Sequence, residues 1–232
     1  MNKKLVKLLC AVMISCTVLV GCNKEEKVEK PAPTADETKF KTEYEGYNNK
    51  DKESGKGKHI VMDVIANNHM KYSNYEEVTK VLDGGTGVIF FSFPTCPWCR
   101  NAAPVLAKAA DEAGVKEILY YNCLDIRDKK KLGDDGKIIT EKEGTKEYYT
   151  LVEKLKDVLP EYKGLNDPSI KRIYFPTIVF VKDGKVVEML KGTVDSQKDA
   201  SVPMNEEQTA ELVKKYKDAF KKIGDGACGE NC

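Results

Sequence analysis

Residues 91–106, FSFPTCPWCRNAAPVL, contain two cysteines three positions apart. An apolar run at 88–93 leads into them and predicts a strand that is buried on both faces. Helical spacing begins at Pro97, and Gly114 is typical of a helix C-terminus. Because proline is favoured at the first helical position, we expect Cys96 at the N-cap, where unpaired N–H groups and the helix dipole stabilise a thiolate.

Cys99 follows one helical turn after Cys96, close enough for a disulfide. This arrangement suits an attacking thiol that forms a mixed disulfide and a resolving thiol that releases it. Trp98, between the two, offers an apolar face to an unfolded or extended substrate. Two other interpretations remain open: an inert structural disulfide, or half of a zinc site completed by Cys228 and Cys232.

Strand and helix signals alternate on both sides of this motif. Four further stretches carry strand signals: 60–65, 117–124, 177–182 and 185–190. Asp183-Gly184 is a strong two-residue hairpin signal between the last two. Helices are expected at 75–82, capped by Ser73 with Glu76, and at 206–223. This order predicts a mixed sheet covered by helices.

Two further motifs give the chain a family resemblance. Pro104, eight residues after Cys96, matches the proline that kinks the active-site helix of thioredoxins. The run YFPT, residues 174–177, followed by a strand and a hairpin, matches their cis-proline loop. Over about residues 59–223 the sequence therefore resembles the thioredoxin superfamily.

The resemblance implies a thioredoxin-like α/β fold, with a mixed central sheet flanked by helices. It implies that Cys96 attacks and Cys99 resolves. It also implies that Pro176 is cis and that Phe175 offers its backbone to the substrate. Together with Trp98, these two residues would line the substrate groove.

Three departures from ordinary thioredoxins stand out. Phe90 occupies the position, six residues before Cys96, where thioredoxins carry a buried acid that assists proton transfer at the buried cysteine. The dipeptide between the cysteines is Pro-Trp, which is nearer the Pro-aromatic pair of glutaredoxins. Residues 126–172 are too many for a simple connection between the third strand and the cis-proline strand. We expect an enlarged crossover with its own helix around Tyr148 and Leu151, which either packs on the sheet or shapes substrate choice.

The N-terminus predicts export. Lys3, Lys4 and Lys7 precede an apolar stretch that is shorter than the roughly 20 residues of a membrane span, as in a signal peptide. The following residues, LVGC, resemble the lipobox of bacterial lipoproteins, which implies removal of residues 1–21 and a lipid on Cys22. An ordinary signal or an uncleaved anchor is the alternative.

The segment after the predicted lipid, residues 22–58, is rich in charge and lacks a sustained apolar period. Such a composition predicts a flexible tether, followed by the thioredoxin-like domain at 59–223. The lipid would hold this domain on the outer face of a bacterial cell membrane, where disulfides persist.

Cysteines outside the motif leave several interpretations open. The tail, residues 224–232, carries Cys228 and Cys232 and is glycine-rich. This pair could relay electrons to Cys96–Cys99, form a disulfide locally or with Cys123, or bind metal. Otherwise Cys123, at the end of a strand, is expected to be a buried and inert thiol.

Charge argues against a nucleic-acid partner, because 38 Lys and Arg are scattered among 37 Asp and Glu. The lipobox and the enlarged crossover are similar to those of thioredoxin-like lipoproteins and bacteriocin-transport accessory proteins of bacteria. We expect a membrane-anchored, extracytoplasmic thiol–disulfide oxidoreductase that acts on exported proteins and exchanges electrons with a second redox protein, for which a membrane protein is one candidate. It needs no dissociable cofactor, since the dithiol carries two electrons. The direction of electron flow is left open.

Two functions of other classes remain as alternatives. One is a lipoprotein that binds zinc or copper(I) through the thiolates of the CxxC motif and of the C-terminal CxxxC pair. The other is an interaction module without redox activity, for which replacement of Cys96 would have no effect.

Overall fold

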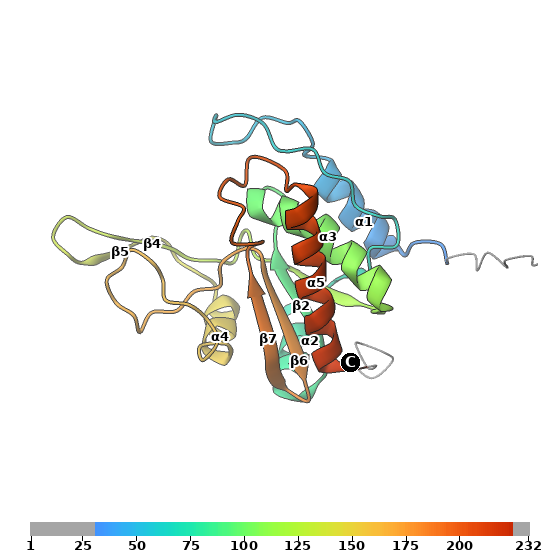
Figure 1. Ribbon diagram of the computed structural model, residues 1–232. Coiled ribbons are helices and arrows are strands. Elements are labelled where there is room, and N and C mark those ends of the chain that lie inside the picture. Colours follow the sequence, from blue (N-terminus) through green and yellow to red (C-terminus); the bar gives the residue numbers. More distant parts are fainter. Residues whose placement is uncertain (1–30, 225–232) are drawn as a thin grey trace, which may run out of the picture. The chain divides into compact units, whose positions relative to one another are not determined.

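A mixed five-stranded sheet forms the centre of the computed structural model, which describes residues 31–224 (Figure 1). Its strands lie side by side in the order β1-β3-β2-β6-β7. In chain order they are β1 (Met70–Tyr72), β2 (Gly87–Ser92), β3 (Ile118–Asn122), β6 (Thr177–Lys182) and β7 (Lys185–Lys191). The strands β1 and β2 run parallel to β3, whereas β6 is antiparallel to both β2 and β7.

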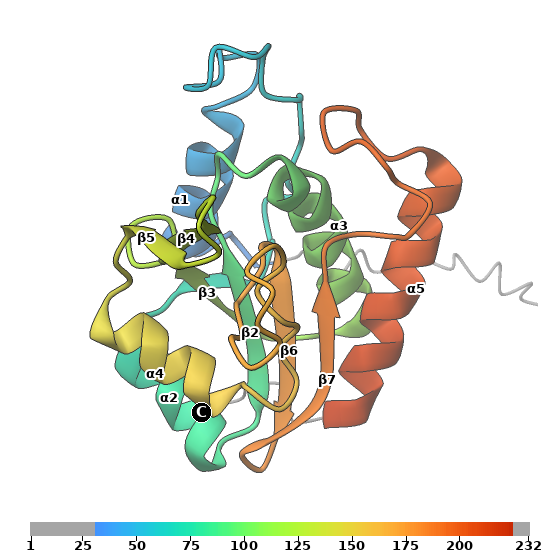
Figure 2. The same ribbon diagram turned by 90° about the vertical axis from the view of Figure 1, so that its left-hand side faces the viewer.

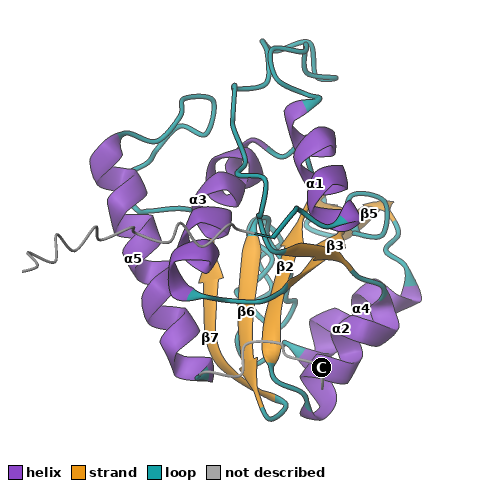
Figure 3. Ribbon diagram, turned by 90° about the vertical axis from the view of Figure 1, so that its right-hand side faces the viewer, coloured by secondary structure: helices purple, strands orange, loops and turns teal. Residues whose placement is uncertain are grey.

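Helices cover both faces of this sheet (Figures 2 and 3). One apolar cluster contains side chains of α1 (Ala35–Glu45), α3 (Pro97–Ala113) and α5 (Glu206–Ile223). The opposite cluster contains side chains of α2 (Tyr75–Gly84) and α4 (Lys146–Lys154). Along β2, Val88 and Phe90 face the first cluster, and Ile89 and Phe91 face the second. The predicted fold class, a mixed central sheet flanked by helices in a thioredoxin-like order, is confirmed.

The chain between β3 and β6 forms the predicted enlarged crossover. It contains a separate two-stranded sheet, β4 (Lys129–Leu132) with β5 (Ile138–Lys142), and then α4. The hairpin extends away from the central sheet (Figure 1), and β5 is exposed along its whole length. Tyr148 and Leu151 of α4 are buried in the cluster on the sheet. The helix therefore attaches the insertion to the domain.

The predicted tether is wrong for residues 35–58, because this segment is folded onto the domain. The helix α1 begins at a capping box formed by Thr34 and Glu37. Phe40 and Tyr44, one turn apart, are fully buried and stack with ring centroids 4.3 Å apart. Two large aromatic side chains on one face contribute to binding this charged helix to the core, although the mean composition of the segment resembles a disordered chain.

The N-terminal predictions before this segment lie outside the described residues. They are the signal at 1–21, the lipid on Cys22 and the first part of the tether. No helix within residues 31–224 is both long and apolar enough to cross a membrane.

The strand predicted at 60–65 is wrong, because this stretch does not join the sheet. Its backbone groups bond to side chains instead. The N–H of Met62 donates to Asn48 Oδ1 at 3.1 Å, and the N–H of Val64 donates to Glu45 Oε1 at 2.8 Å. These partners come from the end of α1 and the loop after it, which no local pattern announces. The first strand of the sheet is β1, several residues later.

The predicted cap of α2 is displaced by one residue. Asn74, rather than Ser73, is the N-cap and forms a capping box with Glu77. The Ser73 hydroxyl instead donates to the backbone carbonyl of Tyr120 at 3.0 Å, which fastens the start of α2 to β3.

Candidate active site

The two cysteines of the CPWC motif lie where β2 ends and α3 begins. Cys96 is the N-cap of α3 with an extended backbone, Pro97 is the first helical residue and Gly114 ends the helix in the left-handed conformation. The Cys96 sulfur accepts a hydrogen bond from the N–H of Cys99 at 3.3 Å. Cys96 is 5% exposed and Cys99 is fully buried. The predicted N-cap is thus confirmed, and only the first cysteine reaches the surface.

The surroundings of the two thiols shift their pKa values in opposite directions. Burial opposes ionisation of Cys96, yet hydrogen bonds from Cys99 and from the backbone N–H of Trp98, with the charge of Arg127, bring its pKa below the ordinary thiol value. Burial and the neighbouring Cys96 sulfur raise the pKa of Cys99 well above that value. The pair thus consists of one thiol that ionises easily and one that keeps its proton.

The predicted cis-proline loop lies directly beside Cys96. The Phe175–Pro176 peptide bond is cis, as expected. The Cys96 thiol donates to the carbonyl oxygen of Phe175 at 3.6 Å, within the range for a sulfur hydrogen bond. Thr177 fixes the loop through its hydroxyl, which donates to the Tyr174 carbonyl at 2.6 Å. A backbone carbonyl is therefore held at the attacking sulfur.

A groove of about 510 Å³ runs past Cys96. It is open to solvent and lined in part by aromatic and cationic side chains: Phe93, Trp98, Arg127, Arg172, Tyr174 and Phe175. Trp98 is half-buried against the core. Of the three residues expected to line a substrate groove, Trp98 and Phe175 line this one and Pro176 does not.

Sequence reasoning missed the two arginines. The Arg127 guanidinium lies 4.5 Å from the centroid of the Phe93 ring and 5.5 Å from that of Phe175. Arg172 is similarly placed, 4.2 Å from the ring of Tyr162. Arg127 lies near the start of the crossover insertion and Arg172 at its end, and no sequence motif marks either of them. Contact with an aromatic ring helps to hold a guanidinium in place.

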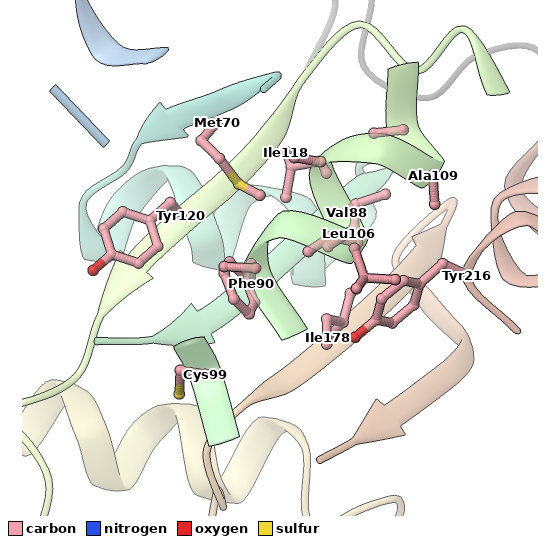
Figure 4. Close-up of a cluster of buried hydrophobic side chains, with 14 of the residues drawn as sticks. Met70, Val88, Phe90, Cys99, Leu106, Ala109, Ile118, Tyr120, Ile178 and Tyr216 are labelled. Carbon is pink, nitrogen blue, oxygen red and sulfur yellow. The ribbon is translucent and has the colours of Figure 1, made fainter. Parts of the chain in front are cut away.

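The position of the missing acid is filled by Phe90, which is fully buried near Cys99 in the core cluster (Figure 4). A different polar group lies nearby. The hydroxyls of Ser92, the last residue of β2, and Tyr44, from α1, are 2.6 Å apart and both residues are fully buried. Sequence reasoning missed both, because Tyr44 was assigned to the tether.

The remaining candidate residues are placed as follows. Cys123 is fully buried, and burial raises the pKa of its thiol far above the ordinary value, as the interpretation of an unreactive thiol requires. His59 is buried against the ring of Tyr47. Cys228 and Cys232 lie outside the described residues.

Within residues 31–224, no group of three or more His, Cys, Asp or Glu side chains could hold a metal ion. The metal-binding alternative therefore has no ligand set in this part of the chain. All three cysteines of that part of the chain are free thiols.

No protein-family model matches the sequence, and no curated protein matches it. Among solved structures, the thioredoxin from Aeropyrum pernix is similar, with 20% sequence identity and a TM-score of 0.34. The match covers 64% of this chain and 85% of that one. The assignment of a thioredoxin-like fold rests on the chain's own features: the sheet order, the CPWC motif at the start of α3 and the cis-proline loop beside it.

Proposed function

We propose that the protein is a thiol–disulfide oxidoreductase. The observation that carries this proposal is the pairing of a Cys96 thiol of lowered pKa, at a helix N-cap, with a buried Cys99 thiol of raised pKa one turn away. A thiolate is the nucleophile in disulfide exchange, so the first thiol is suited to attack. The second is protected until a mixed disulfide has formed beside it.

The reaction proceeds in two exchanges. The Cys96 thiolate attacks a substrate disulfide, forms a mixed disulfide and releases one substrate sulfur as a thiol. Cys99 then loses its proton and attacks the Cys96 sulfur. This step forms the Cys96–Cys99 disulfide and releases the second substrate thiol, so two electrons pass from the protein to the substrate. The reverse sequence oxidises a substrate dithiol.

The groove supports an extended polypeptide as the substrate. The carbonyl of Phe175 offers a backbone hydrogen-bond acceptor beside Cys96, and Trp98 and Phe93 offer apolar contact. Arg127 and Arg172 line the same groove and would favour acidic residues near the substrate cysteine.

The location follows from the N-terminal sequence alone. We propose that the protein is a lipoprotein, anchored through Cys22 on the outer face of a bacterial cell membrane, whose substrates are exported proteins. A second redox protein would restore the Cys96–Cys99 pair. Replacement of Cys22 by serine should release the protein from the membrane fraction; retention there would contradict the lipid anchor.

The test is turnover of a model disulfide such as insulin by the full chain. Cys96→Ser should abolish turnover, and Cys99→Ser should accumulate mixed disulfides. Cys123→Ser is the matched control and should leave turnover unchanged. Turnover that survives Cys96→Ser would overturn the proposal, and stoichiometric metal bound by the reduced protein would favour the metal-binding alternative.

The direction of electron flow is a separate measurement. Titration of the Cys96–Cys99 couple in defined redox buffers gives its potential. A value near about −270 mV indicates a reductant, and one near about −120 mV indicates an oxidant that installs disulfides.

A further inference from the structure

The groove beside Cys96 has a further source of lining residues, the loop of residues 50–59. This loop follows α1 and belongs to none of the strands and helices of the central fold. It projects beyond the end of α1 (Figures 2 and 3). Four of its residues line the groove: Lys52, Glu53, Ser54 and His59. The groove is therefore shaped in part by a segment that neither the CPWC motif nor the cis-proline loop supplies.

Hydrogen bonds between the two arms of the 50–59 loop fix its backbone. The N–H of Lys52 donates to the carbonyl of Gly57 at 3.0 Å, and the N–H of His59 donates to the carbonyl of Lys50 at 2.9 Å. Because the second bond is made by His59 itself, the backbone that carries this side chain has a defined position.

Arg100 ties the base of the loop to the active-site helix. This residue directly follows Cys99, and its guanidinium donates to the carbonyl of Ile60 at 2.8 Å. It also donates to Asn48 Oδ1 at 2.5 Å. Since Ile60 is the next residue after His59, the same guanidinium that is attached to the motif determines where His59 lies.

The His59 side chain has hydrogen-bonding capacity that is not used. The residue is 4% exposed, and its ring meets the edge of Tyr47 with the centroids 5.5 Å apart. Its buried Nδ1 has no hydrogen-bond partner among the described residues. Burial and the charges of Arg100 and Lys52 lower its pKa, so the ring is neutral at neutral pH, with one donor and one acceptor nitrogen. A buried polar group without a partner is costly, and a ligand in the groove can supply that partner.

We propose that the 50–59 loop is a second recognition segment for the polypeptide substrate, and that the His59 imidazole hydrogen-bonds to the substrate main chain beside its cysteine. This inference rests on the proposed function and concerns its selectivity. Each peptide unit of a main chain offers a donor and an acceptor, which matches a neutral imidazole. Sulfur exchange itself does not need this bond, so His59 is a specificity-determining residue.

The charges of the groove favour an acidic polypeptide. Among the described lining residues, the cations Lys52, Arg127 and Arg172 stand against one acid, Glu53. Lys52 thus adds a cation from the 50–59 loop to the two arginines of the insertion. Complementary charge on the substrate would help to orient it between these segments.

The experiment measures the selectivity of the full chain between two disulfides. One is a short acidic peptide with a disulfide-bonded cysteine, and the other is hydroxyethyl disulfide, which has no peptide groups. Selectivity is the ratio of the two kcat/KM values. His59→Leu removes both ring nitrogens and should lower this ratio about tenfold, mainly through the KM of the peptide, as expected for one lost hydrogen bond. His59→Gln keeps a donor and an acceptor and should retain most of the selectivity.

The second histidine of the chain provides the matched control. His69 lies near the C-terminal end of α3, where its Nε2 is 3.6 Å from Asp111 Oδ1. Its φ is 63°, a left-handed conformation that asparagine tolerates. His69→Asn should therefore leave the selectivity of the wild-type protein in place.

A direct binding measurement needs no variant, so it applies even if His59→Leu does not fold. The acidic peptide with serine in place of cysteine is added to the reduced wild-type protein. Its binding should shift the imidazole NMR signals of His59 and leave those of His69 unchanged.

Unchanged selectivity in His59→Leu, or His59 signals that do not respond to the peptide, would overturn the inference. A loss in His59→Gln as large as that in His59→Leu would assign the effect to packing and would also overturn it. A wild-type protein without disulfide turnover would overturn the proposed function, whereas turnover without any role of His59 would overturn this inference alone.

Discussion

Residues 87–114 and residues 34–65 are joined through the side chains of Arg100 and Tyr44, and they are stabilised in different ways. The first segment consists of a strand buried on both faces and a helix with its own N-cap and C-cap. The second has one helix and a long irregular stretch, whose N–H groups at Met62 and Val64 bond to side chains at the end of the helix and in the loop after it, and whose carbonyl at Ile60 accepts from Arg100. The comparison indicates that an active site can combine a locally encoded motif with a support that exists only in the folded domain.

Arg100 is the main link between the two segments. Its guanidinium is fully buried and donates to the carbonyls of Tyr44, Ile60 and Pro94 and to the side chain of Asn48. Burial lowers its pKa, and no carboxylate is among these partners. Hydrogen bonds to carbonyls therefore compensate a charge that would otherwise be costly in the core.

The largest effect should come from separating the second segment from the core. Phe40→Ala removes a fully buried ring, and the cavity should lower the free energy of unfolding by about 3–5 kcal/mol. Chemical denaturation measures this loss. Hydrogen exchange should rise most strongly in α1, and an increase that is equal in α3 would contradict the separate roles of the two segments.

The next largest effect is expected for Arg100→Met, which should lower the free energy of unfolding by about 3 kcal/mol. Several buried carbonyls would lose their donor, and each carbonyl left unpaired costs about 1–3 kcal/mol. Lys108→Met, on the exposed face of the same helix, is the control and should stay within about 0.5 kcal/mol. Denaturation midpoints compare the two. If Arg100→Met lowered stability as little as Lys108→Met, the N-terminal segment would not depend on the hydrogen bonds from Arg100.

Thr34→Ala should cost about 1 kcal/mol, the usual value of an N-cap, because the capping box with Glu37 would be lost. Thermal unfolding measures the change, and Thr34→Asp should restore most of it. If α1 were held by its aromatic residues alone, Thr34→Ala and Thr34→Asp would unfold at the same temperature.

The smallest effect concerns Cys96 rather than the fold. Arg127→Gln removes a charge that lowers the pKa of this thiol, so the pKa should rise by less than about one unit. The thiolate is present above the pKa, and the midpoint of Cys96 alkylation against pH should therefore move upward. Lys185→Gln, at the far hairpin, is the control. A midpoint that stays in place would mean that the hydrogen bonds from Cys99 and Trp98, without Arg127, account for the lowered pKa of Cys96.

Local pattern predicted much of the site. The apolar run before the motif, Pro97 at the first helical position and Gly114 at the end placed Cys96 at the N-cap, and the hairpin at Asp183-Gly184 was also predicted correctly. The cis bond at Pro176 came from the family resemblance and from no local rule. The prediction at 60–65 failed because a local pattern was followed without knowledge of its partners. This apolar and β-branched stretch bonds to side chains instead of to a neighbouring strand.

Local sequence signals were sufficient for the CPWC motif, its strand and helix, and the last hairpin and helix, but not for the first strand of the sheet. Periodicity, caps and turns depend on a few neighbouring residues, so they can be predicted from the sequence alone. The contact of Tyr44 with Arg100, which joins α1 to the active-site helix, and the place of Arg127 near Cys96 depend on the folded domain. These contacts join residues far apart in the chain, and the burial that makes them strong exists only once the core has formed.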